Sequence, residues 1–214
     1  MPPRSAGTLY LIPVALGADA AVPPGTATAV AALRHFVVEN AKSARRFLKA
    51  AGYPSVGLMS EAGCPAVADP GAALVRLAHE RGIRVVPLVG PSAVLLALMA
   101  SGLNGQRFSF HGYLPVDKTE RRRRIEDLER ESALKDATQI FIETPYRNHA
   151  LLSALFETCH DDTLLCLATD LTLPRETVRT QTIRGWKKDP PEIHRRPTVF
   201  LLHREPRQRI TVLP

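Results

Sequence analysis

The first half of the chain alternates between short apolar segments and helical segments, which strongly limits the folds open to it. Residues 8–14 read TLYLIPV, a β-branched, apolar run that is typical of a buried strand. Strands joined by helices pair in parallel through right-handed crossovers. The first half is therefore predicted to be an α/β domain with a parallel sheet. Further strands are expected at 36–38, 56–60 and 83–89, and helices at 27–33, 42–51, 93–101 and from Pro70 to Gly82.

The second half has a different character. Residues 1–106 contain nine Lys or Arg and five Asp or Glu, whereas residues 107–214 contain 19 and 16. We therefore predict a boundary in the turn-rich stretch 112–115, with domains at 1–114 and 115–214. The second domain is expected to be α/β with more antiparallel pairing. Its predicted strands are 107–113, 138–143, 163–170, 178–183 and 198–203, and its predicted helices are 117–131 and 148–158.

Composition excludes several classes of protein. The net charge is +7, with 45% apolar and 23% charged residues, so a disordered acidic tail, a collagen-like chain and a coiled coil are excluded. The three cysteines form no CxxC pair, and the seven histidines have no metal-ligand spacing, so no metal site is expected. The start has no signal-peptide apolar region, and the run 93–100 is too short to span a membrane. A cytoplasmic protein is expected.

Two loops follow predicted parallel strands, where open α/β sheets bind ligands. Residues 60–71 read SEAGCPAVADPG, a long connection whose small residues would let the backbone approach a flat ligand. Residues 89–93 lead into an apolar helix, and Ser92 could accept an anion near the helix start. A plain turn and a simple helix N-cap are the respective alternatives.

The run Arg121-Arg122-Arg123-Arg124 is the sharpest basic feature. Acidic residues follow at i+4, so a solvated helix face is the default interpretation. If the fold gathers it with later basic residues, it would suit an RNA backbone. The motifs GxGxxG, GxxxxGK[ST], HExxH and GxSxG are absent, which argues against the corresponding enzyme classes. The later basic residues are Arg184, Lys187, Lys188, Arg195 and Arg196.

Three segments together resemble the ribosomal RNA small subunit methyltransferase I group of the tetrapyrrole methylase superfamily. They are GTLYLIP at 7–13, SEAGCPAVADPG at 60–71 and VVPLVGPSAVLLALMASGL at 85–103. The resemblance continues through 107–124, IFIETPYR at 140–147, DLTLPRE at 170–176 and RRPTVFLL at 195–202.

This resemblance implies two α/β domains, a homodimer, and S-adenosylmethionine bound in a cleft between the domains, largely through backbone contacts. It also implies a ribosomal RNA substrate in the small subunit, with Arg121–Arg124 as RNA contacts. Carried over residue by residue, the cofactor contacts fall on Pro13, Gly63, Pro65, Ala66, Val67, Ser92, Ala93, Ile142, Leu171, Pro197 and Thr198.

Methyl transfer to a ribose hydroxyl requires a base, and Glu39 and Glu143 are the candidates. The alternative for Glu39 is a solvated residue beside Lys42, and for Glu143 an ion pair with Arg147 at the end of a strand. The Glu-Asp-Thr-Arg motif of the group is Glu39-Asn40-Ala41-Lys42 here, and only residues 53–55 stand where the group has a further strand and helix. Two other functions therefore stay open: methylation of a tetrapyrrole or other small molecule, and non-catalytic binding.

Overall fold

A computed structural model describes residues 8–14, 16, 23–33, 35–38, 56–60 and 62–206. The chain divides into two compact units, Met1–Ser92 and Ala93–Pro214. The predicted helix at 42–51 lies outside the described residues. Within the described residues, none of the helices has both the length and the apolar character needed to cross a membrane.

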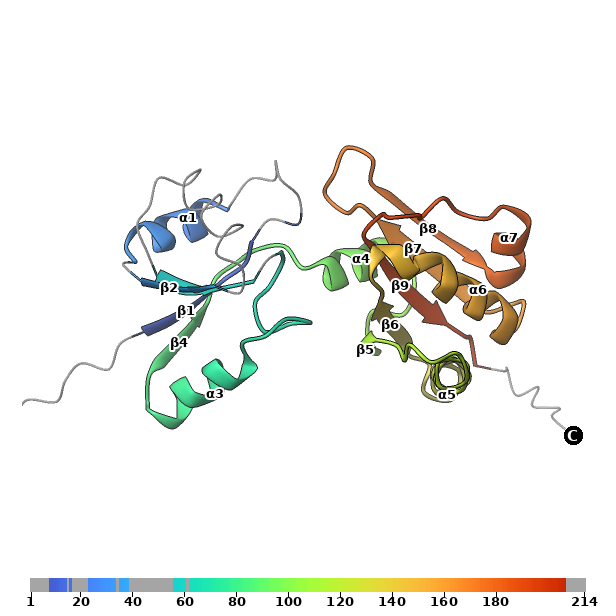
Figure 1. The fold of residues 1–214 in the computed structure, drawn as a ribbon, viewed down its shortest axis with the longest axis horizontal. Helices are drawn as coiled ribbons and strands as arrows, with labels where there is room; N and C mark the ends of the chain where they lie inside the picture. Colours follow the sequence, from blue (N-terminus) through green and yellow to red (C-terminus); the bar gives the residue numbers. More distant parts are fainter. Residues whose placement is uncertain are drawn as a thin grey trace, which may run out of the picture. The chain divides into compact units, whose positions relative to one another are not determined.

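The described part of the first unit contains a four-stranded parallel sheet. Its strands are β1 (Thr8–Ile12), β2 (His35–Val38), β3 (Val56–Met59) and β4 (Arg84–Pro87), in the order β2-β3-β1-β4. The crossover from β1 to β2 and the crossover from β3 to β4 run in opposite directions across the sheet, so α1 (Pro24–Ala31) and α3 (Ala72–Glu80) cover opposite faces (Figure 1). The carboxyl ends of β3, β1 and β4 are therefore neighbours at one edge. The core beneath this edge contains Ile12, Val14, Val30 and Met59.

The second unit contains a mixed five-stranded sheet. Its strands are β5 (Phe108–Tyr113), β6 (Thr138–Ile142), β7 (Leu164–Thr169), β8 (Thr177–Thr182) and β9 (Thr198–His203). Their order is β5-β6-β9-β7-β8, with β5 and β6 parallel and the other pairs antiparallel. The predicted combination of a parallel sheet with a mixed sheet is confirmed.

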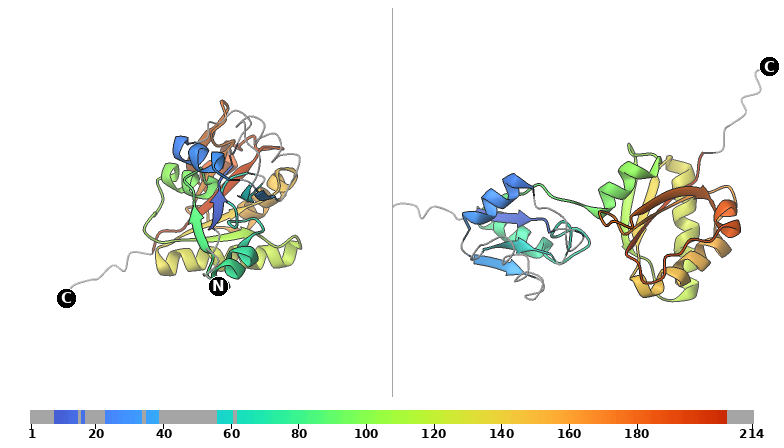
Figure 2. Two further views of the ribbon diagram at one scale, coloured as in Figure 1. Left: turned by 90° about the vertical axis from the view of Figure 1, so that its left-hand side faces the viewer. Right: turned by 90° about the horizontal axis from the view of Figure 1, so that it is seen from above.

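Side chains alternate between the two faces of this second sheet, and each face has its own core. Helix α4 (Ala93–Ser101) covers the face that presents Ile140, Ala168 and Leu201. Helices α5 (Lys118–Lys135), α6 (Asn148–Thr158) and α7 (Ile183–Lys188) cover the face that presents Phe141, Leu165 and Phe200 (Figure 2). This three-layer arrangement explains why β6, β7 and β9 are apolar on both faces.

The observed boundary differs from the predicted one near residue 114. Strand β5 pairs with β6, and α4 packs on β7, β8 and β9, so both belong to the second unit. The change in charge density reports which surfaces are solvated, whereas strand pairing decides which segments fold together. The prediction therefore misplaced residues 93–114.

Two short elements were not predicted. Residues Pro145–Arg147 form a single 3₁₀ turn before α6. Helix α7 has six residues, and the Thr182 hydroxyl caps it by accepting a hydrogen bond from the Gly185 amide at 3.1 Å. Its Trp186 is buried and donates to the carbonyl of Leu165 at 2.8 Å, so tertiary packing, rather than helical periodicity, stabilises this turn.

Candidate functional site

The two predicted loops meet the end of β1 at the carboxyl edge of the first sheet. The Val14 amide donates to the carbonyl of Gly63 at 2.8 Å, and the Gly63 amide donates back to Val14 at 2.9 Å. The Cys64 thiol donates to the carbonyl of Pro91 at 3.5 Å. The segments that follow β1, β3 and β4 are therefore joined through their backbones. We call residues 13–14, 60, 62–71 and 89–92 the strand-end cluster.

The loop that follows β3 has an unusual backbone. Gly63, Ala66 and Ala68 adopt left-handed conformations, with φ angles of 73°, 64° and 61°. For alanine this conformation costs about 1–2 kcal/mol, because Cβ crowds the carbonyl oxygen. The buried Ser60 hydroxyl fixes the start of the loop and lies 3.1 Å from the Gly63 carbonyl oxygen, to which it donates. Such strain persists where the surrounding structure holds it, and it is common at ligand sites.

The loop that follows β4 is held from the opposite side. The buried Thr26 hydroxyl of α1 donates to the Val89 carbonyl at 2.5 Å. Gly90 packs directly against the Pro13 ring, where a side chain on Gly90 has no space. Of the predicted cofactor residues, the strand-end cluster contains Pro13, Gly63, Pro65, Ala66, Val67 and Ser92, whereas Ala93 begins the second unit.

The other four predicted cofactor residues gather at one edge of the second sheet. Ile142 is the last residue of β6, and it lies beside Val199 in the antiparallel pair with β9. Thr198 begins β9 opposite Thr169, and their hydroxyls are 3.2 Å apart. The residue before Leu171 donates its amide to the carbonyl of Pro197 at 2.9 Å. The structure therefore brings Ile142, Leu171, Pro197 and Thr198 together.

A buried ion-pair centre supports this edge, and sequence reasoning missed it. Asp170 is 1% exposed, and its Oδ2 lies 2.8 Å from Nε of Arg175 and 2.7 Å from Nε of Arg196. Its Oδ1 has no protein partner within the described part of the chain. Asp170 also has a left-handed φ of 52°. The DLTLPRE segment shows an acid near an arginine, but Arg196 is distant in sequence and gives no local signal.

Asn148 supports the same edge through buried hydrogen bonds. Its fully buried Nδ2 donates to the carbonyls of Ile193 and Arg196, at 3.1 and 2.7 Å. The same atom lies 3.4 Å from the Thr198 hydroxyl. The first residue of α6 thus fixes the approach to β9, which carries the predicted cofactor contacts Pro197 and Thr198.

Of the two candidate bases, the structure describes only Glu143. Glu39 lies outside the described residues. The Glu143 side chain is 1% exposed, and its Oε1 accepts hydrogen bonds from Nη2 of Arg147 at 2.6 Å and from the Thr144 amide at 2.6 Å. The ion pair at the strand end is therefore present, and it fixes the start of the 3₁₀ turn. This geometry favours an anchoring role for Glu143 over proton transfer.

The four consecutive arginines point in different directions around α5. Arg121 is buried, whereas Arg122 is exposed and pairs with Glu126 at 3.1 Å. Arg124 donates to Nδ1 of His111 on β5 at 2.9 Å, and Arg123 is exposed. Residues of a helix are separated by 100° each, so a run of four cannot form one basic face. The four arginines that were predicted to form one RNA-binding cluster therefore lie on two or more surfaces of the helix.

The polar groups that form the strand-end cluster are mostly backbone amides and carbonyls. The described residues of this cluster include four prolines, three glycines and several alanines, and Cys64 is its one thiol. Small residues and main-chain hydrogen-bonding groups suit a ligand that is recognised by its shape and by backbone contacts. The cluster has the position expected for a ligand site in an open parallel sheet.

The chain is similar to known proteins in sequence and in fold. The chain is 44% identical over 134 residues to a ribosomal RNA small subunit methyltransferase I of Mesorhizobium japonicum, a match that covers 63% of the chain and 44% of that protein. It is 35% identical over 156 residues to the Haemophilus influenzae protein of the same name, covering 72% of the chain and 54% of that protein. The crystal structure of diphthine synthase shares the fold, with a TM-score of 0.65 and 15% identity over 92% of the chain and 90% of that structure.

The matches span about half the length of these two curated relatives. The family match is broader, because residues 11–185 fit the family described as Tetrapyrrole (Corrin/Porphyrin) Methylases. That range includes the whole strand-end cluster and the Ile142 and Leu171 part of the second edge. On this evidence, the chain belongs to the tetrapyrrole (corrin/porphyrin) methylase family.

Proposed function

We propose that this chain is an S-adenosylmethionine-dependent methyltransferase that acts on RNA of the small ribosomal subunit, at a ribose 2′-hydroxyl. The observation that carries the proposal is the strand-end cluster, in which Val14, Gly63 and Pro91 hold three loops together. The names of the two relatives supply the substrate class. The edge formed by Ile142, Leu171, Pro197 and Thr198 contributes further cofactor contacts in this proposal.

The cluster fits such a cofactor on structural grounds. A Cβ on Gly90 would overlap the Pro13 ring, and Gly63 has a φ of 73° that disfavours any side chain. Because neither residue carries a side chain, other main-chain groups of the cluster can approach an adenosyl group closely. When bound, S-adenosylmethionine supplies an electrophilic methyl group on a sulfonium.

The protein's own contribution is alignment and proton removal. Good alignment of two reacting groups can supply about 7–11 kcal/mol of the barrier. In the overall reaction the ribose oxygen gains the methyl carbon, the carbon–sulfur bond breaks, and the hydroxyl proton leaves to a base. Such a base contributes about 10²–10⁴-fold. Glu39 is the proposed base, and Glu143 anchors the Arg147 turn.

The assembly and location also remain proposals. We expect a homodimer, and the exposed Leu95 and Met99 on α4 provide apolar surface for a second copy. Sedimentation equilibrium measures the mass of the particle directly. We also expect a cytoplasmic location, which agrees with a ribosomal substrate and with three free cysteines.

Calorimetric titration with S-adenosylmethionine and with its demethylated product tests the cofactor. We expect one site per chain, and saturation at 100 times Kd should stabilise the fold by about 2.7 kcal/mol. Radiolabelled methyl transfer to small ribosomal subunits then tests the substrate, with large subunits and a tetrapyrrole as parallel acceptors. Transfer to the tetrapyrrole alone would establish the small-molecule alternative. Absence of binding by both ligands would establish the non-catalytic one.

A further inference from the structure

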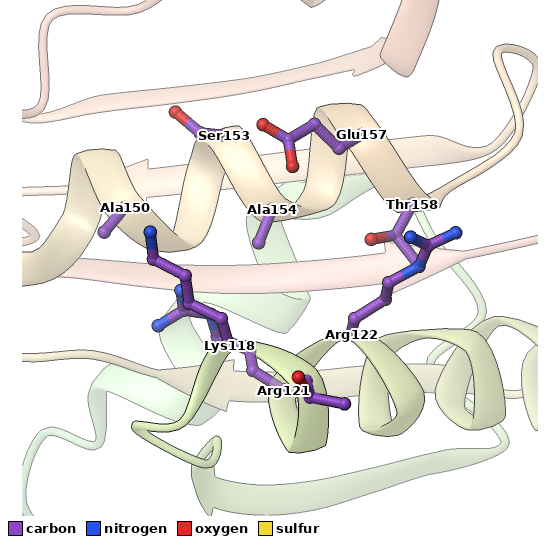
Figure 3. Close-up of a pocket in the computed structure, with 9 residues that line it drawn as sticks. Lys118, Arg121, Arg122, Ala150, Ser153, Ala154, Glu157 and Thr158 are labelled. Atoms are coloured by element: carbon purple, nitrogen blue, oxygen red, sulfur yellow. The ribbon is translucent and has the colours of Figure 1, made fainter.

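A basic groove lies between α5 and α6, and none of the predicted cofactor residues lines it (Figure 3). Its volume is about 490 Å³. Three cations from the first turns of α5 line one wall, and small or hydroxyl-bearing residues of α6 line the other. The wall residues used below are Lys118, Arg121 and Arg122 on α5, with Ala150, Ser153 and Glu157 on α6.

Arg121 is the unusual member of this wall. It is only 7% exposed, because it follows the inward stripe of α5 that also contains Ile125 and Leu128. Its Nη1 donates to the Val116 carbonyl at a long 3.5 Å, and its Nε has no protein acceptor among the described residues. A buried cation with so few partners is costly, so a bound anion would stabilise it.

Nearby carboxylates do not supply that anion. Asp117 is close enough to Arg121 to feel its charge, but its carboxylate caps α5 by accepting from the amides of Thr119 and Glu120 at 2.9 and 3.0 Å. Those backbone hydrogen bonds are the main cause of its lowered pKa. Asp117 is therefore committed to the helix end.

The charges that line the groove favour an anion. Lys118 and Arg121 lie toward Ala150, whereas the Arg122 guanidinium lies toward Thr158 (Figure 3). Glu126 partly neutralises Arg122, and Glu157 is the one acidic residue that lines the groove. The side chains of Lys118 and Arg121 thus form the more positive end.

We propose that this groove binds a backbone phosphate of the RNA substrate, with Lys118 and Arg121 as its main cationic contacts and Ser153 as a hydroxyl donor. Arginine suits phosphate because its donors form a planar fork, and lysine adds a point charge. A volume of about 490 Å³ exceeds that of one phosphate and leaves room for the adjoining sugars. Contacts of this kind position an RNA without reading its sequence. The identity of the polymer rests on the proposed function.

The test compares two double variants that each remove two exposed positive charges from α5. Lys118→Gln with Arg122→Gln removes groove charges. Arg123→Gln with Lys135→Gln is the matched control, because neither residue lines the groove and Lys135, like Arg122, pairs with a glutamate four residues away. Affinity for a fragment of small-subunit RNA is measured from 50 to 200 mM salt.

We expect the groove variant to reduce the slope of log affinity against log salt by about 0.7, because one phosphate contact of a single strand contributes about that amount. The control variant should change the slope by less than half of that amount. Equal effects of the two double variants would overturn the proposal, because they would show a diffuse charge effect without a groove.

Two further measurements avoid the risk that an arginine variant misfolds. Ala150→Glu places a negative charge in the groove without removing a cation, and it should weaken RNA binding at least tenfold relative to Ala150→Gln. Inorganic phosphate should shift the amide resonances of residues 118–122 and 150–158 in the wild-type chain. Wild-type RNA affinity in Ala150→Glu would contradict the proposal.

The groove and the proposed function fail in different ways. If the variants weaken RNA binding while no methyl group reaches the small subunit, the groove stands and the proposed reaction fails. If the wild-type chain methylates the subunit and the groove variant binds RNA with unchanged affinity and slope, the reaction stands and the groove proposal is wrong.

Discussion

Gly90 passes so close to Pro13 that a Cβ on Gly90 would lie 2.2 Å from the Cβ of Pro13 and 2.7 Å from its Cγ. No real side-chain contact is that short, so the loop after β4 keeps its position against the end of β1 only with glycine at residue 90. This contact links two of the three loops of the strand-end cluster, and it explains why the second loop can stay close to the sheet.

Gly90→Ala should therefore displace the loop rather than merely crowd it. We expect a loss of stability of about 1–3 kcal/mol, which is typical of overpacking, and a weaker affinity for S-adenosylmethionine. Gly25→Ala is the control, because no atom lies within 4 Å of its added Cβ and alanine favours a helix. Urea unfolding and calorimetric titration measure the two effects. Equal stabilities of both variants would show that the loop adapts freely.

Replacing a left-handed alanine in the loop after β3 should have the opposite effect on stability. Ala68 is exposed and has a φ of 61°, so Ala68→Gly should relieve strain. The gain should be at most about 1 kcal/mol, because glycine also raises the entropy of the unfolded chain. Cofactor affinity should fall in the same variant, since the loop becomes less ordered.

Ala62→Gly is the appropriate comparison, because Ala62 lies in the same loop without a positive φ. It should lower the melting temperature, whereas Ala68→Gly should raise it. If both variants are destabilised equally, Ala68 stores no strain.

Asp170 should contribute far more to stability than an exposed aspartate that has a similar contact. Asp170→Asn leaves Arg175 and Arg196 beside a neutral amide, and we expect a loss of about 2–3 kcal/mol, below the usual range for buried pairs because Arg175 is largely exposed. Asp189→Asn removes a 2.8 Å pair with Arg179 that is exposed on both sides, and it should cost less than about 1 kcal/mol. Urea unfolding of the two variants provides the comparison.

The sequence was most informative about the elements and the positions of the loops. The positions of β1, β3, β4 and helix 93–101 could be predicted from apolar segments and from the glycines that end helices, because each of these signals is local. The position of the loop at 60–71 followed from strand-end topology. The domain boundary required knowledge that β5 pairs with β6, and Asp170 required knowledge that Arg196 reaches it from a distant turn. Both facts are products of tertiary structure.

The arginine run is a different case, because its signal was present in the sequence. Arg121 precedes Ile125 by four residues and Leu128 by seven, which is the spacing of one helix face. That spacing places Arg121 inward and its neighbours elsewhere. Successive residues of a helix are separated by 100°, so the direction of each side chain in a basic run has to be worked out before the run is assigned to one binding surface.

The three cysteines should differ sharply in reactivity. Burial raises the pKa of the Cys64 thiol above its ordinary value near 9.0, and deeper burial raises the pKa of the Cys159 and Cys166 thiols. A raised pKa means less thiolate at neutral pH, so alkylation should be slow at pH 7.5 and should accelerate beyond pH 9. In the native protein Cys64 alone should react, because the other two are buried.

Mass spectrometry after iodoacetamide treatment identifies the modified residue. Cys64→Ser should leave the native chain unmodified, and unfolded chain should react at all three positions. S-adenosylmethionine should slow alkylation of Cys64, because this thiol belongs to the strand-end cluster. Rapid alkylation at pH 7.5 would contradict the raised pKa of this thiol.

The last prediction separates anchoring from proton transfer at Glu143. Its carboxylate is buried and binds Nη2 of Arg147 at 2.6 Å, so Glu143→Gln and Arg147→Met should each destabilise the fold. If the pair only anchors the turn, removing both partners should restore part of the stability, with a coupling energy of about 0.5–3 kcal/mol. Methyl transfer should recover with it. Single-turnover transfer and urea unfolding are measured on the same four proteins.

A catalytic base would behave differently in this cycle. The double variant would then stay slower than wild type by about 10²–10⁴-fold even where its stability returned. We expect Glu39→Gln to slow methyl transfer by that factor with little change in stability. For the double variant at Glu143 and Arg147, we expect methyl transfer to recover. Loss of transfer in both Glu143 variants, independent of stability, would return Glu143 to the role of base and would require its carboxylate to leave Arg147 when RNA binds.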